Sequence, residues 1–411
     1  MDKKIPNKYK FIVLLGKALH TCGVPSYKIQ NYLSEIARNK GLEGSFMDTP
    51  TWINYVFYEE DEHTYNYIEC VPPGGLDLGA LSRVTEITGQ VLNREITDDE
   101  AVDKISKSKH QNKSYDLFLD ALTFIVSGGA FCVILKTNWV TAFAASILGL
   151  LVFLVSLLAS KSAYIRSTLE SMVAFVSTIG AGVLSVFFPE INISLAVLSS
   201  IIIFIPGLAI TTAIEEITSK NLVSGTAKLG GALVSLFKQF FGVILGVSIL
   251  PFFIEIKNVP LVSDIPLWVD PIAFTFMSLG LVFSLRIRYK DMIYAIITAF
   301  ISYYTTILMD FSGLFISIFV GTIVVVFFSS LFNRISGGPK LVFLIPGIIV
   351  LVPGSKAFIG LSTIFLQTHS GLNYNMGEQV SYILMGIIGG LIFSGSFMNK
   401  KNIRIKETGK L

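Results

Sequence analysis

The chain has 411 residues, of which 52% are hydrophobic and 15% charged, and its formal net charge is +3. A charge this small, spread between apolar segments, excludes a basic nucleic-acid-binding surface, so we expect no nucleic-acid partner. The three cysteines form no CxxC pair, which excludes the usual zinc-site and disulfide-framework spacings, and we expect neither metal nor cofactor. The composition predicts a membrane protein.

Residues 1–115 mix charged and apolar positions and predict a small α+β domain. Two helices come first, over Tyr9–Thr21 and from Ser26, a predicted N-cap, to about Asn39. Asp77 is expected to cap a third helix, and Thr97-Asp98-Asp99-Glu100 is a capping-box start for a fourth. Three β-rich segments between them predict a small sheet: Gly41–Phe46, Thr51–Tyr58 and Tyr65–Val71.

From residue 116 onward, long apolar segments alternate with short polar ones, and ten are long enough to cross a bilayer core, which takes roughly 20 helical residues. The expected spans are Leu117–Leu135, Trp139–Ala159, Thr168–Phe188, Ile191–Thr212, Ala227–Ile254, Leu267–Leu285, Met292–Met309, Gly313–Phe332, Leu341–Leu361 and Gln379–Met398. They predict an all-α polytopic membrane domain with halves at 116–255 and 256–400, followed by a tail at 401–411. Lys and Arg gather in the connections on one side, which places the N-terminal domain and the tail in the cytoplasm.

Two apolar runs are interrupted by the same dipeptide: Ile-Ile-Ile-Phe-Ile-Pro-Gly ends at Gly207 and Ile-Ile-Val-Leu-Val-Pro-Gly ends at Gly354. Proline removes a helix hydrogen bond and glycine lets the backbone open, so spans four and nine are expected to be broken helices. The breaks are 147 residues apart, and a Gly-rich motif recurs 144 residues on, at Gly242–Gly246 and Gly386–Gly390. With five spans per half, the second half enters from the opposite side, which predicts a 5+5 inverted repeat.

Broken helices offer backbone groups to a cargo, because a helix N-terminus presents N–H groups to an anion and released carbonyls can hold a cation. An amino acid zwitterion needs both. The predicted substrate-binding residues are Pro206, Gly207, Thr211, Thr212, Pro353, Gly354, Ser355 and Lys356. A tolerated kink without a ligand is the alternative for either break alone, whereas the register-matched pair favours a site.

Charged residues in or beside spans are the candidates for carrying a coupled proton. They are Asp120, Glu170, Glu215, Glu216 and Lys238. Each has a structural alternative: Asp120 as a helix cap, the three glutamates as a solvated rim, and Lys238 as a snorkelling or paired side chain.

The N-terminal domain holds His20, Cys22 and His63, which could be imagined as a hydrolase site, but we expect an ordinary surface there. The chain has no GxxxxGK[ST] motif, which disfavours ATP-driven transport by this chain alone. We expect no enzyme activity.

Several motifs resemble the threonine/serine exporter family over nearly the whole chain. In the N-terminal domain they are Leu14–Leu19, Gly23–Tyr27, Thr49–Thr51, Leu76–Leu81 and Thr97–Ala101, and in the membrane domain Ile205–Gly207, Ser224-Gly225 and Val352–Ser355. The resemblance implies proton-driven export of threonine and serine across the plasma (inner) membrane. It leaves a homo-oligomer open.

The sequence departs from the family pattern at two positions. Ala80 stands where the family resemblance leads us to expect a basic residue, which argues against an anion-binding role there. Lys356 follows the second break and suits a more acidic cargo. Some relatives with separate halves resemble a dicarboxylate exporter. The alternatives to an amino acid exporter are therefore an exporter of succinate-like dicarboxylates and a membrane sensor or channel without coupled transport.

Overall fold

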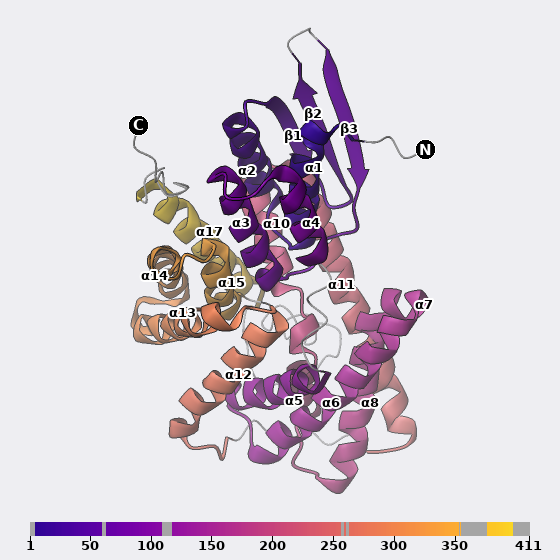
Figure 1. Cartoon of the computed structure of the whole chain (residues 1–411). Helices are drawn as coiled ribbons and strands as arrows, with labels where there is room; N and C mark the ends of the chain where they lie inside the picture. The colour runs from indigo at the N-terminus through magenta and orange to yellow at the C-terminus, as the bar shows by residue number, and fades with distance from the viewer. Residues whose placement is uncertain are drawn as a thin grey trace.

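The structure is a computed structural model that describes residues 5–59, 63–108, 117–255, 259, 263–352, 354 and 376–397. An N-terminal α+β domain stands on an assembly of apolar helices (Figure 1). The sequence predicted this division into a small mixed domain and a helical membrane part.

In the N-terminal domain α1 and α2 pack against a three-stranded antiparallel sheet, and α3 and α4 pack on the other side of α1. The sheet has the order β1-β2-β3, with Glu43 opposite Tyr58 and Trp52 opposite Cys70. Alternate residues of β2 are buried, as expected for a strand with one face on a core. The elements are α1 Asn7–Thr21, α2 Ser26–Asn39, β1 Glu43–Asp48, β2 Trp52–Tyr58, β3 Thr64–Cys70, α3 Leu78–Leu92 and α4 Asp98–Ser108.

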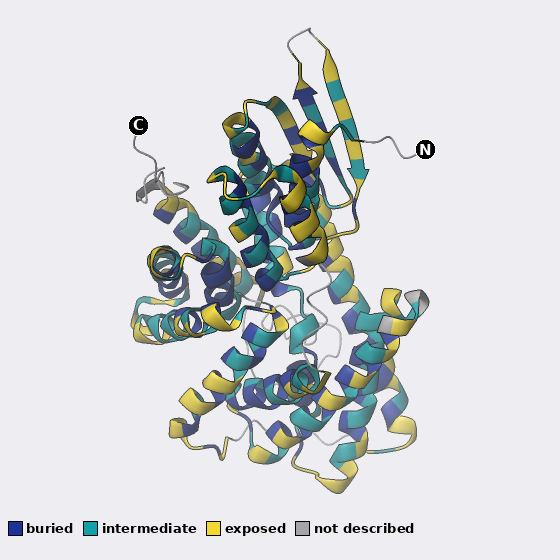
Figure 2. Cartoon of the chain, viewed as in Figure 1, coloured by how far each residue is buried: buried dark blue, intermediate teal, exposed yellow. Residues whose placement is uncertain are grey.

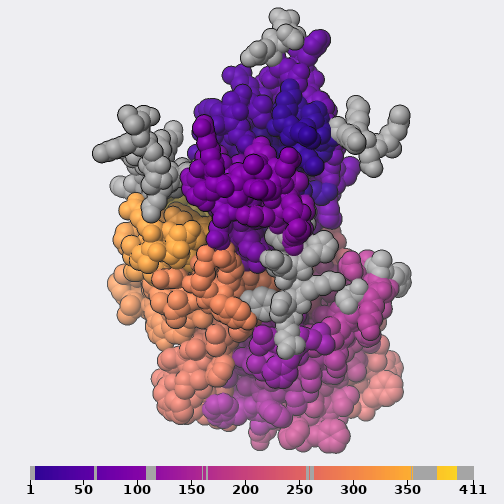
Figure 3. All heavy atoms as spheres, viewed as in Figure 1, coloured from indigo at the N-terminus to yellow at the C-terminus, as the bar shows by residue number. Residues whose placement is uncertain are grey.

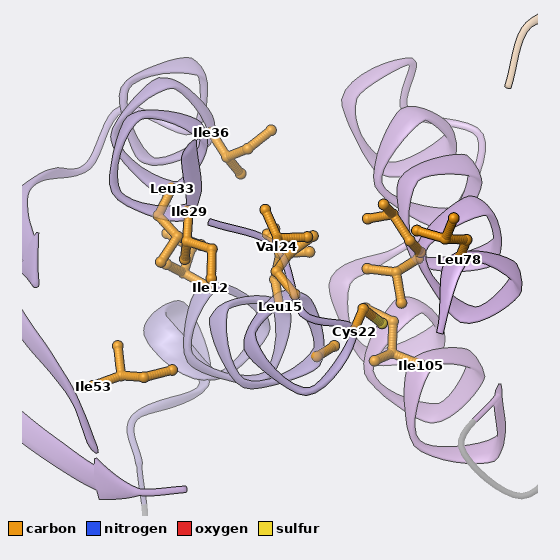
Figure 4. Close-up of a cluster of buried hydrophobic side chains, with 14 of the residues drawn as sticks. Ile12, Leu15, Cys22, Val24, Ile29, Leu33, Ile36, Ile53, Leu78 and Ile105 are labelled. Atoms are coloured by element: carbon orange, nitrogen blue, oxygen red, sulfur yellow. The ribbon is translucent and has the colours of Figure 1, made fainter. Parts of the chain in front are cut away.

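The core of this domain combines aromatic side chains, such as Phe11 and Tyr55, with aliphatic ones. Ile12 from α1 packs with Leu33 from α2, Ile53 approaches from β2, and Leu78 and Ile105 close the other side from α3 and α4 (Figure 4). All five are fully buried. Truncating one of them to alanine removes about 2–5 kcal/mol from the free energy of unfolding.

Two predicted helix starts of this domain are confirmed. The Asp77 carboxylate accepts from the Ala80 N–H at 2.7 Å, and Thr97 and Glu100 exchange side-chain to backbone hydrogen bonds as a capping box does. The predicted cap at Ser26 is wrong, because Pro25 is the N-cap residue and the Ser26 hydroxyl points to Ser224 instead.

Eight of the remaining helices are long and apolar enough to cross a bilayer, within the described part of the chain. Eight of the ten predicted spans coincide with them. The main helices of this region are α5 Leu117–Ile134, α6 Trp139–Lys161, α8 Leu169–Phe187, α9 Ile193–Ser200, α10 Gly207–Thr218, α11 Leu222–Ile249, α12 Asp270–Ser284, α13 Tyr289–Leu308, α14 Leu314–Ser336, α15 Lys340–Leu351 and α17 Met376–Phe397. Short helices α7 Ala163–Ser167, η2 Ile202–Phe204, η3 Leu250–Phe252, η4 Leu267–Val269 and η5 Asp310–Ser312 lie between them.

The fourth and ninth predicted spans differ from the others. The fourth is the pair α9 and α10, bent by 57° at the break. The ninth begins as α15, a helix of 12 residues, and the rest of that predicted span, apart from Val352 and Gly354, lies outside the described residues. The count of ten spans therefore stays a prediction.

Large apolar side chains cover the outward faces of these helices. Phe143, Leu154, Phe187, Phe237 and Phe241 are all exposed, and exposed positions recur along the lower helices in Figure 2. Apolar surface of this extent is expected against lipid and not against water.

Corresponding helices pair in the same way in the two halves. In the first half α5 packs on α6, α6 on α8 and α8 on α11; in the second, α12 packs on α13, α13 on α14 and α14 on α17. Two close helix contacts of the first half recur 144 residues later in the second half. Gly242 approaches Ser171 and Gly246 approaches Thr178; correspondingly, Gly386 approaches Phe315 and Gly390 approaches Thr322. The inverted orientation of the halves stays a prediction.

The N-terminal domain covers one end of both halves (Figure 3). Its hydrophobic core continues without interruption into Leu285 and Ile287, which precede α13, and into Val342 and Phe343 of α15. The domain is therefore packed onto the helices and is not a tethered appendage.

Candidate functional site

The first break lies between α9 and α10. After Ser200 the chain makes one turn of 3-10 helix, Ile205 is extended, and α10 begins at Gly207 with Pro206 before it. Proline cannot continue the hydrogen bonds of the preceding helix, which explains why the chain bends here. No side chain in the described part of the chain caps the N-terminus of α10.

The second break follows α15. The helix ends at Leu351 and Val352 is extended, with φ −66° and ψ 137°. A second Pro-Gly pair, Pro346-Gly347, lies inside this helix and does not end it. The Ser302 hydroxyl of α13 donates to the Gly347 carbonyl at 2.8 Å. The sequence analysis did not consider this pair.

The two breaks meet at Gly207 and Gly354. A Cβ on Gly207 would lie 3.1 Å from the Cα of Gly354 and 2.5 Å from a methyl of Val352, and a Cβ on Gly354 would lie 3.2 Å from the Cα of Gly207. Only glycine permits this approach of the two backbones. The structure thus brings together two residues that the sequence had placed at equivalent points of the two halves.

A cavity of about 420 Å³ adjoins the second break. Its volume is in the range of small-molecule sites. Val352 both lines it and lies against Gly207, so the cavity is next to the crossing of the breaks. The lining residues come from the ends of α13 and α15, the start of α14, and α17: Thr306, Ile307, Asp310, Leu314, Ser317, Ile318, Val350, Leu351, Val352 and Ile383.

The predicted hydroxyls beside the first break bond within their own helix. Thr211 donates to the Gly207 carbonyl at 3.2 Å and Thr212 to the Leu208 carbonyl at 3.0 Å. Their oxygens remain able to accept. Pro353, Ser355 and Lys356 lie outside the described residues.

Gln239 of α11 also touches the first break, and the sequence analysis did not select it. Its side-chain amide is fully buried and donates from Nε2 to the Phe204 carbonyl at 2.7 Å. Phe204 is the last residue of η2, so Gln239 satisfies a carbonyl at the break. A neutral polar residue in the middle of an apolar helix was the only signal in the sequence.

Glu216 and Glu215, at the other end of α10, bind the N-terminal domain. Glu216 is fully buried and accepts from the Ser26 backbone N–H at 2.8 Å and from Lys228. Glu215 accepts from the Tyr27 hydroxyl and pairs with Lys28 at 3.3 Å. For Glu216 the alternative of a solvated rim is wrong, because the start of α2 covers it.

The packing of α2 on α10 also changes the pKa of Tyr27. Burial, followed by the charge of Glu215, raises the pKa of the Tyr27 hydroxyl well above its ordinary value. Tyr27 therefore stays a neutral donor to Glu215 at any physiological pH.

The other proton-coupling candidates lie apart from this cluster. Lys238 donates to the Ser167 carbonyl at 2.9 Å and lies 3.7 Å from Glu170, so the structure brings two separately predicted candidates together. Asp120 is half-buried in the first turn of α5.

The N-terminal domain contacts the second half through α3. The Leu78 N–H donates to the Leu285 carbonyl at 3.0 Å, and a Cβ on Gly79 would lie 2.2 Å from the Arg286 carbonyl oxygen. Nearby, Ser82 donates to the buried Asp291 at 3.3 Å. Sequence reasoning selected neither Arg286 nor Asp291 as interface residues, because the contact joins positions about 200 residues apart.

Inside the N-terminal domain, the buried His20 in the last turn of α1 makes two polar contacts. Its ring nitrogens contact an Asp48 carboxylate oxygen at 2.8 Å and the Pro72 carbonyl at 3.1 Å. The expectation of an ordinary surface here is wrong, because His20 and Asp48 are both buried. His63 is exposed and lies outside this cluster.

Two protein-family models match this chain, one in each part of the sequence. One family model for a threonine/serine exporter matches residues 10–250, and a second threonine/serine exporter model matches residues 270–397. No solved structure matches the chain.

The chain is also similar to curated fungal proteins, at low sequence identity. Pheromone-regulated membrane protein 10 of Debaryomyces hansenii is 25% identical over 60% of this chain and 25% of its own length. The protein of the same name from Eremothecium gossypii is 22% identical over 89% of this chain and 50% of its own. This chain spans between a quarter and a half of the length of these two relatives. The two family models together cover most of the sequence, and the chain belongs to the threonine/serine exporter family.

Proposed function

We propose that this protein is a secondary active transporter that exports threonine and serine across the plasma membrane, with both termini in the cytoplasm. The observation that carries the proposal is the contact of Gly207 with Gly354, which sets the uncapped N-terminus of α10 beside the C-terminal end of α15. The first carries a partial positive charge and the second a partial negative one. Together they suit the carboxylate and ammonium of one amino acid.

The cavity beside the second break supplies the volume for such a cargo. Asp310 offers a carboxylate to an ammonium group, and Thr306 and Ser317 offer hydroxyl oxygens. The cavity lies at the end of α13 farther from the N-terminal domain, whose contacts are with the start of that helix. This arrangement fits a carrier closed toward the N-terminal domain.

Alternating access is supported by the recurrence of helix pairings and of glycine contacts between the halves. If the second half is inverted, the two broken spans exchange roles when the carrier opens to the other side. Among the candidate acids, Glu215, Glu216 and Glu170 each have an ion partner. We therefore assign the coupled proton to Asp120.

Transport by the purified protein in liposomes tests this function. The vesicles are loaded with labelled threonine, serine or succinate, and a pH gradient is imposed across the membrane. Efflux of threonine or serine that follows the gradient supports the proposal. Movement of succinate alone supports the dicarboxylate exporter, and leak that ignores the gradient supports a channel.

A further inference from the structure

The side chain of Gln239 presents one amide atom that the fold does not use. Nε2 is engaged by the Phe204 carbonyl at 2.7 Å, whereas Oε1 has no hydrogen-bond donor among the described residues. The side chain is 0% exposed, so water does not reach it from outside. An amide oxygen left unpaired in an apolar interior is destabilising, which is a reason to look for a ligand there.

The orientation of this amide is fixed by its neighbour. Exchanging the oxygen and nitrogen would set Oε1 against the Phe204 carbonyl oxygen, so that two acceptors would face each other. The group left for a ligand is consequently an acceptor. Any molecule bound there has to bring a donor.

We infer that Gln239 Oε1 is a specificity-determining contact of the transport site and accepts a hydrogen bond from the hydroxyl group of the substrate. The inference rests on the proposed function and adds to it the residue that recognises the hydroxyl group. A single neutral amide oxygen suits a neutral donor such as a hydroxyl group. The carboxylate and ammonium groups of the amino acid interact instead with the N-terminus of α10 and the C-terminal end of α15. A dicarboxylate is ionised at pH 7 and brings only acceptors, so this contact also disfavours succinate.

The test compares threonine with valine, which replaces the hydroxyl by a methyl group at nearly the same volume. The full-length protein in liposomes exports labelled threonine while unlabelled serine, valine or succinate competes from the same side. We expect serine to compete, and valine and succinate to compete about tenfold less well, because a site built for a hydroxyl leaves its acceptor unpaired with valine. If valine competes as well as serine in the wild-type protein, that result by itself overturns the inference.

Two variants locate the effect at this side chain. Gln239→Met removes the acceptor and is expected to bring the threonine to valine preference close to one. Gln239→Glu keeps an acceptor and, when protonated, a donor to Phe204, and is expected to retain the preference as pH is lowered. Thr226→Val on the same helix is the control, because its hydroxyl bonds only within α11. An unchanged preference in folded Gln239→Met overturns the inference.

Failure of the proposed function would look different. If threonine, serine and succinate all fail to move, binding is still measurable as thermal stabilisation of the detergent-purified protein by each compound. Stabilisation by threonine over valine, lost in Gln239→Met, supports the contact without transport. Equal stabilisation by both compounds, or none by either, contradicts it.

Discussion

Gly207 and Gly354 touch through their backbones although 147 residues separate them, with a Cβ on either one placed 3.1 to 3.2 Å from the Cα of the other. Each is the glycine of a Pro-Gly pair that ends an apolar run. The meeting of the breaks is therefore a property of both halves at once, and it can be disrupted from either side.

A leucine at either glycine is expected to abolish transport. Gly207→Leu or Gly354→Leu forces the breaks apart, and overpacking of this kind costs about 1–3 kcal/mol. Efflux from liposomes and the melting temperature measure the two effects separately. Gly230→Leu on α11 is the matched control, since no atom lies within 4 Å of its added Cβ. Full transport by both break variants would remove the crossing from the mechanism.

The N-terminal domain is expected to loosen from α10 when Glu216 is truncated. Glu216→Ala leaves the part-exposed Lys228 and the buried Ser26 N–H without their acceptor, and leaving a buried donor unsatisfied costs about 1–3 kcal/mol. Ser26→Ala, which loses only the hydroxyl contact with Ser224, is expected to cost about 1 kcal/mol. Limited proteolysis between the domain and α5 reports the docking. Equal protection in Glu216→Ala and wild type would contradict this role.

The contact between the N-terminal domain and the second half of the membrane domain is expected to weaken slightly in acid. Glu86 bonds to Arg288 at 2.7 Å, and that hydrogen bond lowers the pKa of Glu86 below its ordinary 4.5. The lowered folded-state pKa means that the contribution is present above pH 4.5 and is lost as the pH falls through the lowered value. Glu86 is half-exposed, so the contribution is only about 0.5 kcal/mol.

The difference in melting temperature between wild type and Glu86→Gln, followed from pH 7 to pH 3, isolates this pair from other carboxylates. We expect a small difference at neutral pH that vanishes in acid. A difference that grows in acid would show that the sign is wrong.

The recurring glycine contacts predict matched effects in the two halves. Gly246→Leu separates α11 from Thr178, and Gly390→Leu separates α17 from Thr322, so the two variants are expected to lose similar stability, about 1–3 kcal/mol each. Gly231→Leu and Gly395→Leu on the same two helices are the controls, because nothing lies within 4 Å of their added Cβ. A large loss in one half only would show that the halves do not pack alike.

Local patterns in the sequence predicted the elements and the two breaks. Apolar runs of about 20 residues can only be buried by lipid or by other apolar helices, so eight predicted spans coincide with helices. The Asp77 cap and the Thr97–Glu100 capping box are interactions between residues three positions apart, which sequence spacing shows directly. The Pro206-Gly207 break follows from the covalent geometry of proline.

Contacts between distant parts of the chain were decided by the tertiary structure alone. Ser26 has the residue type and position of a helix cap, yet the packing of α2 on α10 gives its backbone N–H to Glu216, 190 residues away. Gln239 has no local partner to reveal it, and its role depends on a carbonyl 35 residues earlier that becomes free only when the helix breaks. Sequence spacing determines which polar groups a helix presents on each face, whereas the contacts between groups on different helices depend on how the helices pack.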